Sequence, residues 1–166
     1  MHDPEDSATE FLRLFAELGT EAVVIGALAA LRYRREPRLT TDVDFLVKDA
    51  SGLAEALRSR GFEVREHSEA GQPAHSLFVR GNGHKVDVLV AETSYQAVAI
   101  SRAIDGYLAV EDVLVHKLIA WRPRDRDDIA SILDAGVAYD DAYVRHWASE
   151  WDVLDRWGVA VRRGAG

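Results

Sequence analysis

The order of apolar and polar residues predicts a helix near the start of the chain. Between Phe11 and Leu18 the apolar residues recur at the three- and four-residue spacing of one helical face. Ser7 and Glu10 have the spacing of a capping box, in which each side chain bonds the backbone of the other residue. Gly19 follows the last apolar position and is a typical helix stop. We therefore predict an amphipathic helix that begins at Ser7 and ends before Gly19.

Beyond this helix, short β-branched runs alternate with longer segments of helical spacing. The predicted strands are 21–25, 42–47, 62–65, 75–80 and 85–90. The predicted helices are 27–33, 52–60, 95–103, 110–121, 125–133 and 140–157. The segment 81–84, Gly-Asn-Gly-His, is a hairpin signal between the last two strands. This order predicts an α/β (α+β) fold with a mixed β-sheet flanked by helices and a helical C-terminal third.

The length of the chain is typical of one domain, since it has 166 residues. We expect a single domain over 1–166, with an α/β core over 1–106 and a helical part over 107–160. No apolar run approaches the roughly 20 residues of a membrane span, and the first residues are acidic rather than basic. We therefore expect a cytoplasmic protein with no membrane partner.

Composition excludes several kinds of site. The chain has no cysteine, which excludes a disulfide framework, a zinc-thiolate site and a cysteine nucleophile. Its formal net charge of −8 argues against non-specific coating of nucleic acid, because that binding requires a positive surface. Local basic patches are still compatible with this charge, and arginines gather at 32–38 and at 122–126.

Paired carboxylates are the main candidate for chemistry. In the strand 42–47, Asp42 and Asp44 alternate with apolar residues and so share the face opposite the core. Asp87 holds the same kind of position in the strand 85–90. If the two strands are neighbours, three carboxylates meet on one face, and such an oxygen cluster suits one or two Mg²⁺ ions. The alternative is that each aspartate is simply solvated at the end of a strand.

A glycine turn is a second, weaker candidate. Gly26 separates the strand 21–25 from an alanine-rich helix that starts at Ala27. The free amides of a first helical turn can bind a phosphate, although a tight turn with close packing explains the same sequence. The segment is neither a Walker loop nor a dinucleotide-binding fingerprint.

These features together resemble a known family. A strand that ends in glycine, a short helix, an Asp-x-Asp strand and a later third aspartate are similar to the DNA polymerase β-like nucleotidyltransferase superfamily. The details look most like its small prokaryotic branch, which includes the AbiEii-type abortive-infection toxins. The segments that carry the resemblance are 25–31, Ile-Gly-Ala-Leu-Ala-Ala-Leu, then 38–45, Arg-Leu-Thr-Thr-Asp-Val-Asp-Phe, and 116–129, which begins His-Lys-Leu-Ile and ends Asp-Asp-Ile.

The resemblance implies a nucleotidyltransferase-type sheet, a two-metal magnesium site in which Mn²⁺ is also possible, and roles for particular residues. The implied catalytic residues and metal ligands are Asp42, Asp44 and Asp87, with Asp87 also drawing the proton from the acceptor hydroxyl. The implied nucleotide-binding residues are Gly26, Ala27, Arg38, Thr40, Lys117 and Asp128.

The expected reaction is the transfer of a nucleoside monophosphate from a nucleoside triphosphate such as ATP to an acceptor hydroxyl. The resemblance suggests an RNA, a tRNA end or a protein as acceptor, a toxin role and an antitoxin partner, with the arginines at 32, 34, 35 and 38 as a phosphate-binding edge. A small-molecule acceptor of the aminoglycoside type is an alternative. Ala27 stands where the superfamily usually has Gly or Ser, so a degenerate module that binds a nucleotide or a partner is another.

The remaining histidines and aromatic residues suggest no further chemistry. The histidines at 67, 75, 84, 116 and 146 show no metal-ligand spacing on one helix, and we expect them to be mostly at the surface or locally hydrogen-bonded. Tyr143, Trp147 and Trp151 recur every four residues in the last predicted helix. We interpret them as a stripe that packs on the body of the protein, and the alternative is a docking face for a partner.

Overall fold

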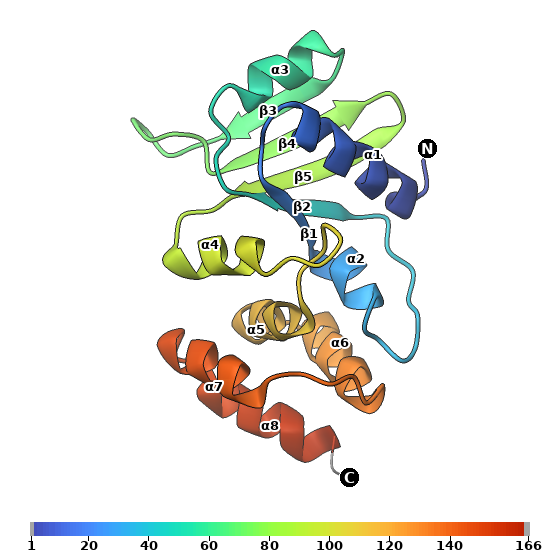
Figure 1. The fold of residues 1–166 in the computed structure, drawn as a ribbon, viewed down its shortest axis with the longest axis vertical. Helices are drawn as coiled ribbons and strands as arrows, with labels where there is room; N and C mark the ends of the chain where they lie inside the picture. Colours follow the sequence, from blue (N-terminus) through green and yellow to red (C-terminus); the bar gives the residue numbers. More distant parts are fainter. Residues whose placement is uncertain (1, 165–166) are drawn as a thin grey trace. The chain divides into compact units, whose positions relative to one another are not determined.

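The computed structural model describes residues 2–164, so the first residue and the last two of the predicted domain lie outside it. In the N-terminal part, five strands alternate with four helices, and four more helices follow (Figure 1). In chain order the elements are α1 (Pro4–Glu17), β1 (Ala22–Ile25), α2 (Gly26–Leu31), β2 (Val43–Val47), α3 (Leu53–Ser59), β3 (Glu63–His67), β4 (Ser76–Gly81), β5 (His84–Val90), α4 (Ser94–Ser101), α5 (Val110–Ala120), α6 (Pro123–Asp134), α7 (Asp141–Glu150) and α8 (Leu154–Gly164).

The five strands form one mixed sheet in the order β1-β2-β5-β4-β3. β2 and β5 run parallel, and the other neighbouring strands run antiparallel. The prediction of a mixed sheet flanked by helices, followed by a helical C-terminal part, is confirmed.

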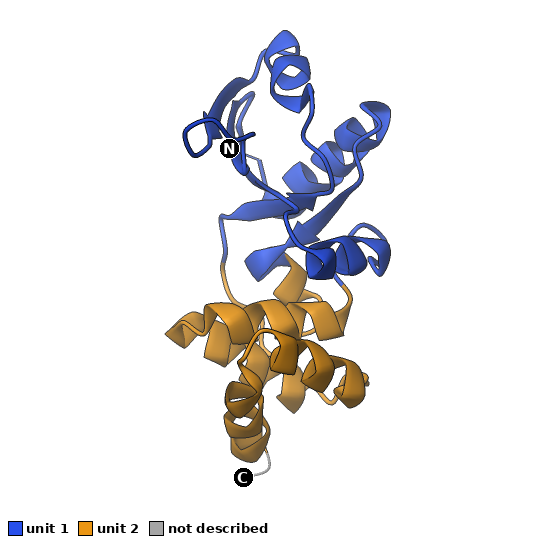
Figure 2. Cartoon of the chain, turned by 90° about the vertical axis from the view of Figure 1, so that its left-hand side faces the viewer, with its two compact units in different colours: residues 1–28, 40–108 blue, residues 29–39, 109–166 orange. Residues whose placement is uncertain are grey.

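The chain forms two compact units, which Figure 2 shows in different colours. Unit 1 contains residues 1–28 and 40–108 and holds the sheet with α1, α3 and α4. Unit 2 contains residues 29–39 and 109–166 and holds helices α5 to α8. The main boundary between the units follows residue 108, and the segment 29–39 groups with the C-terminal helices, while the single domain over 1–166 stays a prediction.

The core of unit 1 lies between α1 and one face of the sheet. The ring centroids of Phe11 and Phe15 on α1 lie 6.4 Å and 5.0 Å from that of Phe45 on β2. Because neighbouring residues of a strand point to opposite faces, Asp44 lies on the face away from α1. The packing of α1 thus leaves the carboxylate face of β2 on the other side of the sheet.

The start of α1 differs from the prediction. Asp3 is the N-cap and accepts a hydrogen bond of 2.8 Å from the backbone of Glu5, and Pro4 takes the first helical position. The predicted capping box of Ser7 and Glu10 is therefore wrong, since a better start signal lies one turn upstream. The two side chains contact His84 instead, at 2.9 Å from Ser7 Oγ to Nδ1 and at 3.1 Å from Glu10 Oε2 to Nε2.

Two histidines lie away from the open surface. His84 is only 5% exposed, packs edge-on against Phe11 and is hydrogen-bonded to Ser7, which is one of the two environments expected for the histidines. Burial lowers the pKa of His116 on α5 to about 4, and the positive charge of Lys117 acts in the same direction.

The predicted helix 140–157 is two helices. Asp152 has a φ of +55°, and the backbone of Val153 donates a hydrogen bond of 2.7 Å to the carbonyl of Ala148. This is a Schellman motif, in which aspartate takes the left-handed position that glycine usually occupies. It ends α7 at Glu150 and lets α8 start in a new direction.

The break also changes which aromatic residues are buried in unit 2. Trp157 on α8 is fully buried and donates a hydrogen bond of 3.0 Å to Asp141, whereas Trp151 is 38% exposed. Tyr143 donates a hydrogen bond of 2.6 Å to Asp112. Of the predicted stripe of Tyr143, Trp147 and Trp151, the last residue is therefore largely at the surface.

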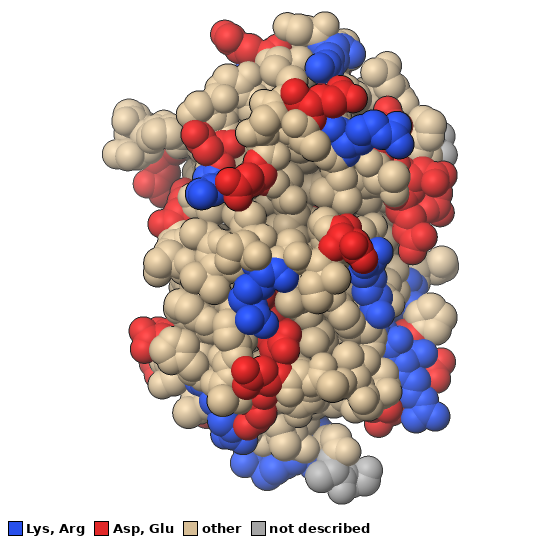
Figure 3. Space-filling model, in the orientation of Figure 1, with Lys and Arg blue, Asp and Glu red and all other residues tan. Residues whose placement is uncertain are grey.

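Acidic and basic side chains are interspersed on the face drawn in Figure 3, with no single broad basic field there. Among residues 2–164, no helix is long and apolar enough to cross a membrane.

Candidate active site

Two of the three candidate carboxylates lie side by side at the join between β2 and β5. Asp44 and Asp87 are register partners in this parallel pair, so their α-carbons occupy the same level of neighbouring strands, about 4.8 Å apart. Both residues are half-buried. Since register partners share a face, the two carboxylates stand next to each other on the face opposite α1.

Gly26 lies against one of these carboxylates. A Cβ atom added to Gly26 would be 2.7 Å from Oδ2 of Asp44, closer than any side chain could come. Gly26 also has a φ of +69°, in the left-handed region that disfavours other residues. The glycine at the turn into α2 therefore has a defined role here, which is to give the Asp44 carboxylate room. Ala27 follows it in the first turn of α2 and is half-buried.

One oxygen of Asp87 is buried and has no hydrogen-bond donor among the described residues. Nη1 of Arg80 lies 2.9 Å from this Oδ1, but its two hydrogens point to the carbonyls of Val79 and Val86, at 2.9 Å and 3.0 Å. Arg80 thus pairs with Asp87 electrostatically and leaves a lone pair of Oδ1 available. A buried polar atom of this kind is rare in structures and is often completed by an ion or a ligand.

Asp42, the third candidate carboxylate, lies just outside the strands that carry this pair. It is exposed and precedes β2, which begins at Val43. Its backbone donates a hydrogen bond of 3.2 Å to Oγ1 of Thr40, so Thr40 shapes the entry to the strand. Within residues 2–164, no group of three or more His, Asp or Glu side chains is arranged to hold a metal ion.

The pair Asp44 and Asp87 nevertheless fits a divalent cation such as Mg²⁺. Mg²⁺ is usually held by one or two protein carboxylates, while water and substrate phosphates complete its octahedral shell. The orphaned oxygen of Asp87 is a suitable ligand, because it is an anionic oxygen that accepts no hydrogen bond, and a cation there would share it with the ion pair to Arg80. The two strands β2 and β5 thus bring together two carboxylates rather than a complete protein cage.

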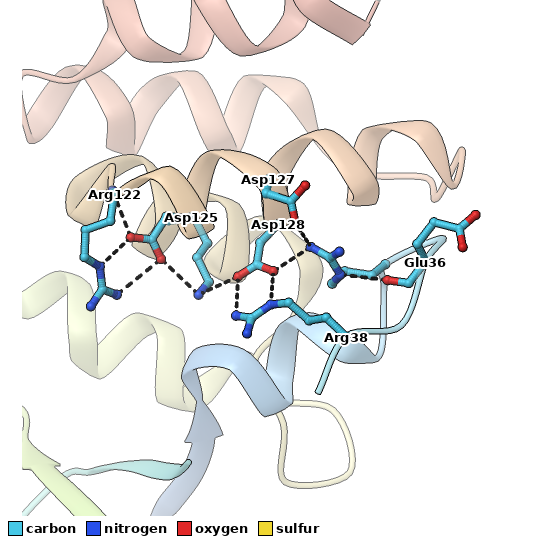
Figure 4. A network of polar contacts seen from close by, with 8 residues as sticks. Glu36, Arg38, Arg122, Asp125, Asp127 and Asp128 are labelled. Atoms are coloured by element: carbon cyan, nitrogen blue, oxygen red, sulfur yellow. Dashed lines mark hydrogen bonds and ion pairs between the residues drawn. The ribbon is translucent and has the colours of Figure 1, made fainter. Parts of the chain in front are cut away.

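The other predicted nucleotide-binding residues belong to a buried ionic network in unit 2 (Figure 4). Nζ of Lys117 lies 3.1 Å from Asp125 and 2.9 Å from Asp128, and both carboxylates are fully buried. Asp128 also accepts hydrogen bonds from Arg38, at 2.9 Å and 3.1 Å, and from Arg34, at 2.7 Å. Asp128 is the centre of the network, because it binds three cations.

The network has as many negative as positive side chains. Its cations are Arg34, Arg38, Lys117 and Arg122, and its anions are Asp125, Asp127, Asp128 and Glu36, whose backbone carbonyl accepts a hydrogen bond from Arg34. Desolvation raises the pKa of both buried aspartates, but hydrogen bonds from the cations outweigh it and lower the pKa overall. The hydrogen bonds come from Arg122 and Lys117 to Asp125, and from Arg38 and Lys117 to Asp128.

The predicted phosphate-binding edge at 32–38 is partly wrong. The side chain of Arg34 is only 5% exposed and is bound to two aspartates, so it is not available as a surface cation. Arg35 is 62% exposed and lies near Glu36 and Asp134 at 4.0 Å and 3.8 Å. The sequence pattern missed these pairings, because the aspartates lie about ninety residues away in the chain.

Sequence reasoning also missed Arg80 and Asp125. The contact of Arg80 with Asp87 could have been predicted from the hairpin signal. The hairpin pairs Arg80 with Lys85, which places Arg80 diagonally beside Asp87. For Asp125, one turn before Asp128 on α6, no local signal distinguishes a buried aspartate from a solvated one.

Two cavities lie elsewhere in the units. One of about 630 Å³ lies between the segment 69–75 and residues 90–92 of unit 1. The other, of about 380 Å³, is lined by residues of α6 and α8 with Trp121, in unit 2. None of the three predicted catalytic aspartates lines either cavity.

Comparison with known proteins identifies the fold. No family model matches the chain, and no curated protein matches it significantly. Seven solved chains are similar to it, and two of them match over most of both chains. One is the antibiotic-resistance factor ANT(2'')-Ia, whose solution structure shows substrate-regulated conformation dynamics, with a TM-score of 0.58, 16% identity and 95% of each chain covered. The other is an antigenic nucleotidyltransferase-like protein from Paracoccidioides brasiliensis, with a TM-score of 0.51, 16% identity, and 96% of this chain and 91% of that one covered. The chain therefore has the nucleotidyltransferase fold.

Proposed function

We propose that this chain is a magnesium-dependent nucleotidyltransferase. The observation that carries the proposal is the register pair of Asp44 and Asp87, with Gly26 shaped to make room for the Asp44 carboxylate. A fold hosts many functions, so the proposal rests on this site together with the fold.

Asp44 and Asp87 would hold the magnesium ion, and Asp42 at the entry of β2 is the proposed third ligand. Mg²⁺, when bound, supplies neutralisation of phosphate charge and lowers the pKa of a hydroxyl at the site. Manganese is expected to substitute, since it takes similar oxygen ligands.

Asp87 is the proposed base. With Oδ1 assigned to the metal ion, the second carboxylate oxygen of Asp87 would accept the proton of the acceptor hydroxyl. The hydroxyl oxygen then forms a bond to the α-phosphorus of the nucleoside triphosphate. The bond from that phosphorus to the bridging oxygen breaks, and pyrophosphate leaves with the electron pair.

In unit 2, Arg38 is the proposed phosphate-binding cation, since its side chain is 25% exposed. Lys117 is 7% exposed and bound to two aspartates, and is proposed to hold Asp128 in place beside Arg38. Asp128 is then a positioning residue, since it holds both cations in place. Gly26, Ala27 and Thr40 in unit 1 are proposed to shape the nucleotide-binding turn.

The test uses purified protein, Mg²⁺ and each α-phosphate-labelled ribonucleotide, with total RNA, protein extract and an aminoglycoside offered as separate acceptors. We expect label in an acceptor with the unchanged protein and its loss in Asp87→Asn. Asp49→Asn is the matched control, because it removes the same charge from an exposed loop of unit 1. Equal transfer by Asp87→Asn and Asp49→Asn would refute the proposal.

Metal-dependent nucleotide binding without transfer would instead support a degenerate module, which the alanine at position 27 makes the main rival. Label in the aminoglycoside would support a small-molecule acceptor. A toxin role of the AbiEii type predicts growth arrest on expression, relieved by a partner encoded beside it.

A further inference from the structure

The cavity of about 380 Å³ in unit 2 has no part in the proposed reaction. It is lined by residues of α6 and α8, two helices that pack together in unit 2 (Figure 1), and by Trp121, which directly follows α5. None of its lining residues is a predicted catalytic or nucleotide-binding residue. Its volume is typical of a pocket that holds one small molecule.

The walls of the cavity are mainly apolar. Pro123 and Ala130 come from α6, Ala160 comes from α8, and the indole ring of Trp121 joins them. The two alanines are short, so they leave space between the helices that a longer side chain would fill. None of the described lining residues is Ser, Thr, Asn, Gln or His. The cavity therefore offers few hydrogen-bond partners to a ligand with many polar groups.

Trp121 has an uncommon backbone conformation and contacts two arginines. Its φ of +50° is left-handed, and its backbone donates a hydrogen bond of 2.9 Å to the carbonyl of Lys117 at the end of α5. Glycine or asparagine usually takes this position, because a bulky side chain is unfavourable there. The guanidinium carbons of Arg126 and Arg156 lie 5.5 Å and 5.9 Å from the centre of the indole ring, which is cation–π distance. The indole thus helps to hold Arg126 at the cavity.

The charged groups of the cavity leave two guanidiniums available. Neither Arg126 nor Arg163 has a carboxylate partner within residues 2–164. The one acidic lining residue, Asp127, already pairs with Arg34 at 3.1 Å. Guanidinium groups bind carboxylate and phosphate through charge-assisted hydrogen bonds. The cavity therefore combines an apolar wall with a positive end.

From this combination we propose that the cavity binds a small organic anion with an apolar body. Its single carboxylate or phosphate group is bound by Arg126 and Arg163, and its body lies against Trp121, Ala130 and Ala160. A cationic ligand is disfavoured by the two guanidiniums, and a ligand rich in hydroxyl groups is disfavoured by the apolar walls. The inference does not depend on the proposed function, because it concerns other residues and requires no transfer.

The first test compares three probes of similar shape by calorimetric titration of the full chain. Naphthalene-2-carboxylate and 2-naphthyl phosphate carry the anionic group, and naphthalene-2-carboxamide keeps the ring without the charge. We expect both anions to bind and the amide to bind about 10-fold more weakly, the lower end of the range for a hydrogen bond to a charged group. The anion that binds more tightly identifies the natural ligand as a carboxylate or a phosphate ester.

The second test removes one charge from the cavity. Arg126→Gln is expected to weaken binding of both anions about 10-fold and to leave binding of the amide unchanged. Arg124→Gln is the matched control, because Arg124 is an exposed arginine of the same helix that does not line the cavity. Anion binding by Arg124→Gln should equal that of the unchanged protein.

The third test fills the cavity and keeps its charges. Ala130→Leu should abolish binding of all three probes, because the longer side chain occupies the space of the ligand body. Ala130 is an exposed residue within α6 and leucine favours helices, so the variant is expected to fold. Ala142→Leu, at an exposed position of α7, is the control and should bind the probes normally.

Equal affinity for the carboxylate and the amide would overturn the proposal, as would a complete lack of binding. Unchanged binding of naphthalene-2-carboxylate in Ala130→Leu would place the probe elsewhere and would also overturn it. The same is true if Arg124→Gln weakens binding as much as Arg126→Gln, because the overall charge of the helix would then explain the effect. Urea denaturation of each variant verifies that it is folded during the titration.

Discussion

Replacing Gly26 with alanine tests the geometry of the proposed metal pair. The new Cβ would lie 2.7 Å from Oδ2 of Asp44, so the carboxylate must move. The substitution also forces alanine into a left-handed conformation, with φ at +69°. Both effects act at once, and a matched variant is needed to separate them.

Gly19→Ala provides that control, because Gly19 has a φ of +71° and an added Cβ there meets nothing within 4 Å. The left-handed conformation alone costs about 1–2 kcal/mol, which is the expected loss of unfolding free energy in Gly19→Ala. Crowding in a packed site adds about 1–3 kcal/mol, so Gly26→Ala should lose about 2–5 kcal/mol.

The assay combines urea denaturation with nucleotide transfer at several Mg²⁺ concentrations. Gly19→Ala should keep its turnover under conditions where the protein is folded. Gly26→Ala should lose turnover or require more Mg²⁺, because Asp44 is displaced. If both variants unfold at the same urea concentration and transfer equally well, the close approach of Gly26 and Asp44 does not matter and our reasoning is wrong.

Two further predictions concern buried charges. Lys117→Met should lower the unfolding free energy by about 3–5 kcal/mol, because it removes a cation from two fully buried carboxylates; a loss below about 1 kcal/mol in urea denaturation would contradict this. His116 has a folded pKa of about 4 against 6.5 when unfolded, so the unfolded state binds the proton first. The stabilisation that comes from keeping His116 neutral should therefore be fully present above pH 6.5. The unfolding free energy should fall by about 1.4 kcal/mol per pH unit as the pH drops toward 4. Denaturation measured across this pH range should lose that slope in His116→Gln.

The strands of the sheet were predicted well from the sequence, because apolar and polar residues alternate within most of them. The strand 42–47 was predicted within one residue of β2, and the hairpin of β4 and β5 followed from its glycine turn. The break at Asp152 was not predictable in the same way, since aspartate only occasionally takes a left-handed conformation.

The candidate site was predictable in its residues but not in its arrangement. Asp44 and Asp87 stand out in sequence because each interrupts an apolar strand. That they are neighbours depends on the pairing of β2 with β5, which joins strands about forty residues apart and leaves no local signal. In unit 2, no local pattern marks Lys117 and Asp128 as buried, and their burial is possible only because each compensates the charge of the other.

The position of Asp44 and Asp87 in the sheet determines when, during folding, the proposed metal site can form. β3, β4 and β5 form a meander of antiparallel neighbours, while β1 and β2 form a separate antiparallel pair. The parallel contact of β2 with β5 is the seam that joins these two subassemblies, and it spans a long stretch of sequence, which is slow to close in folding. Asp44 comes from the pair of β1 and β2, and Asp87 comes from the meander of β3, β4 and β5. A folding chain that has formed only one of these two subassemblies therefore cannot yet bind a metal ion between the two carboxylates.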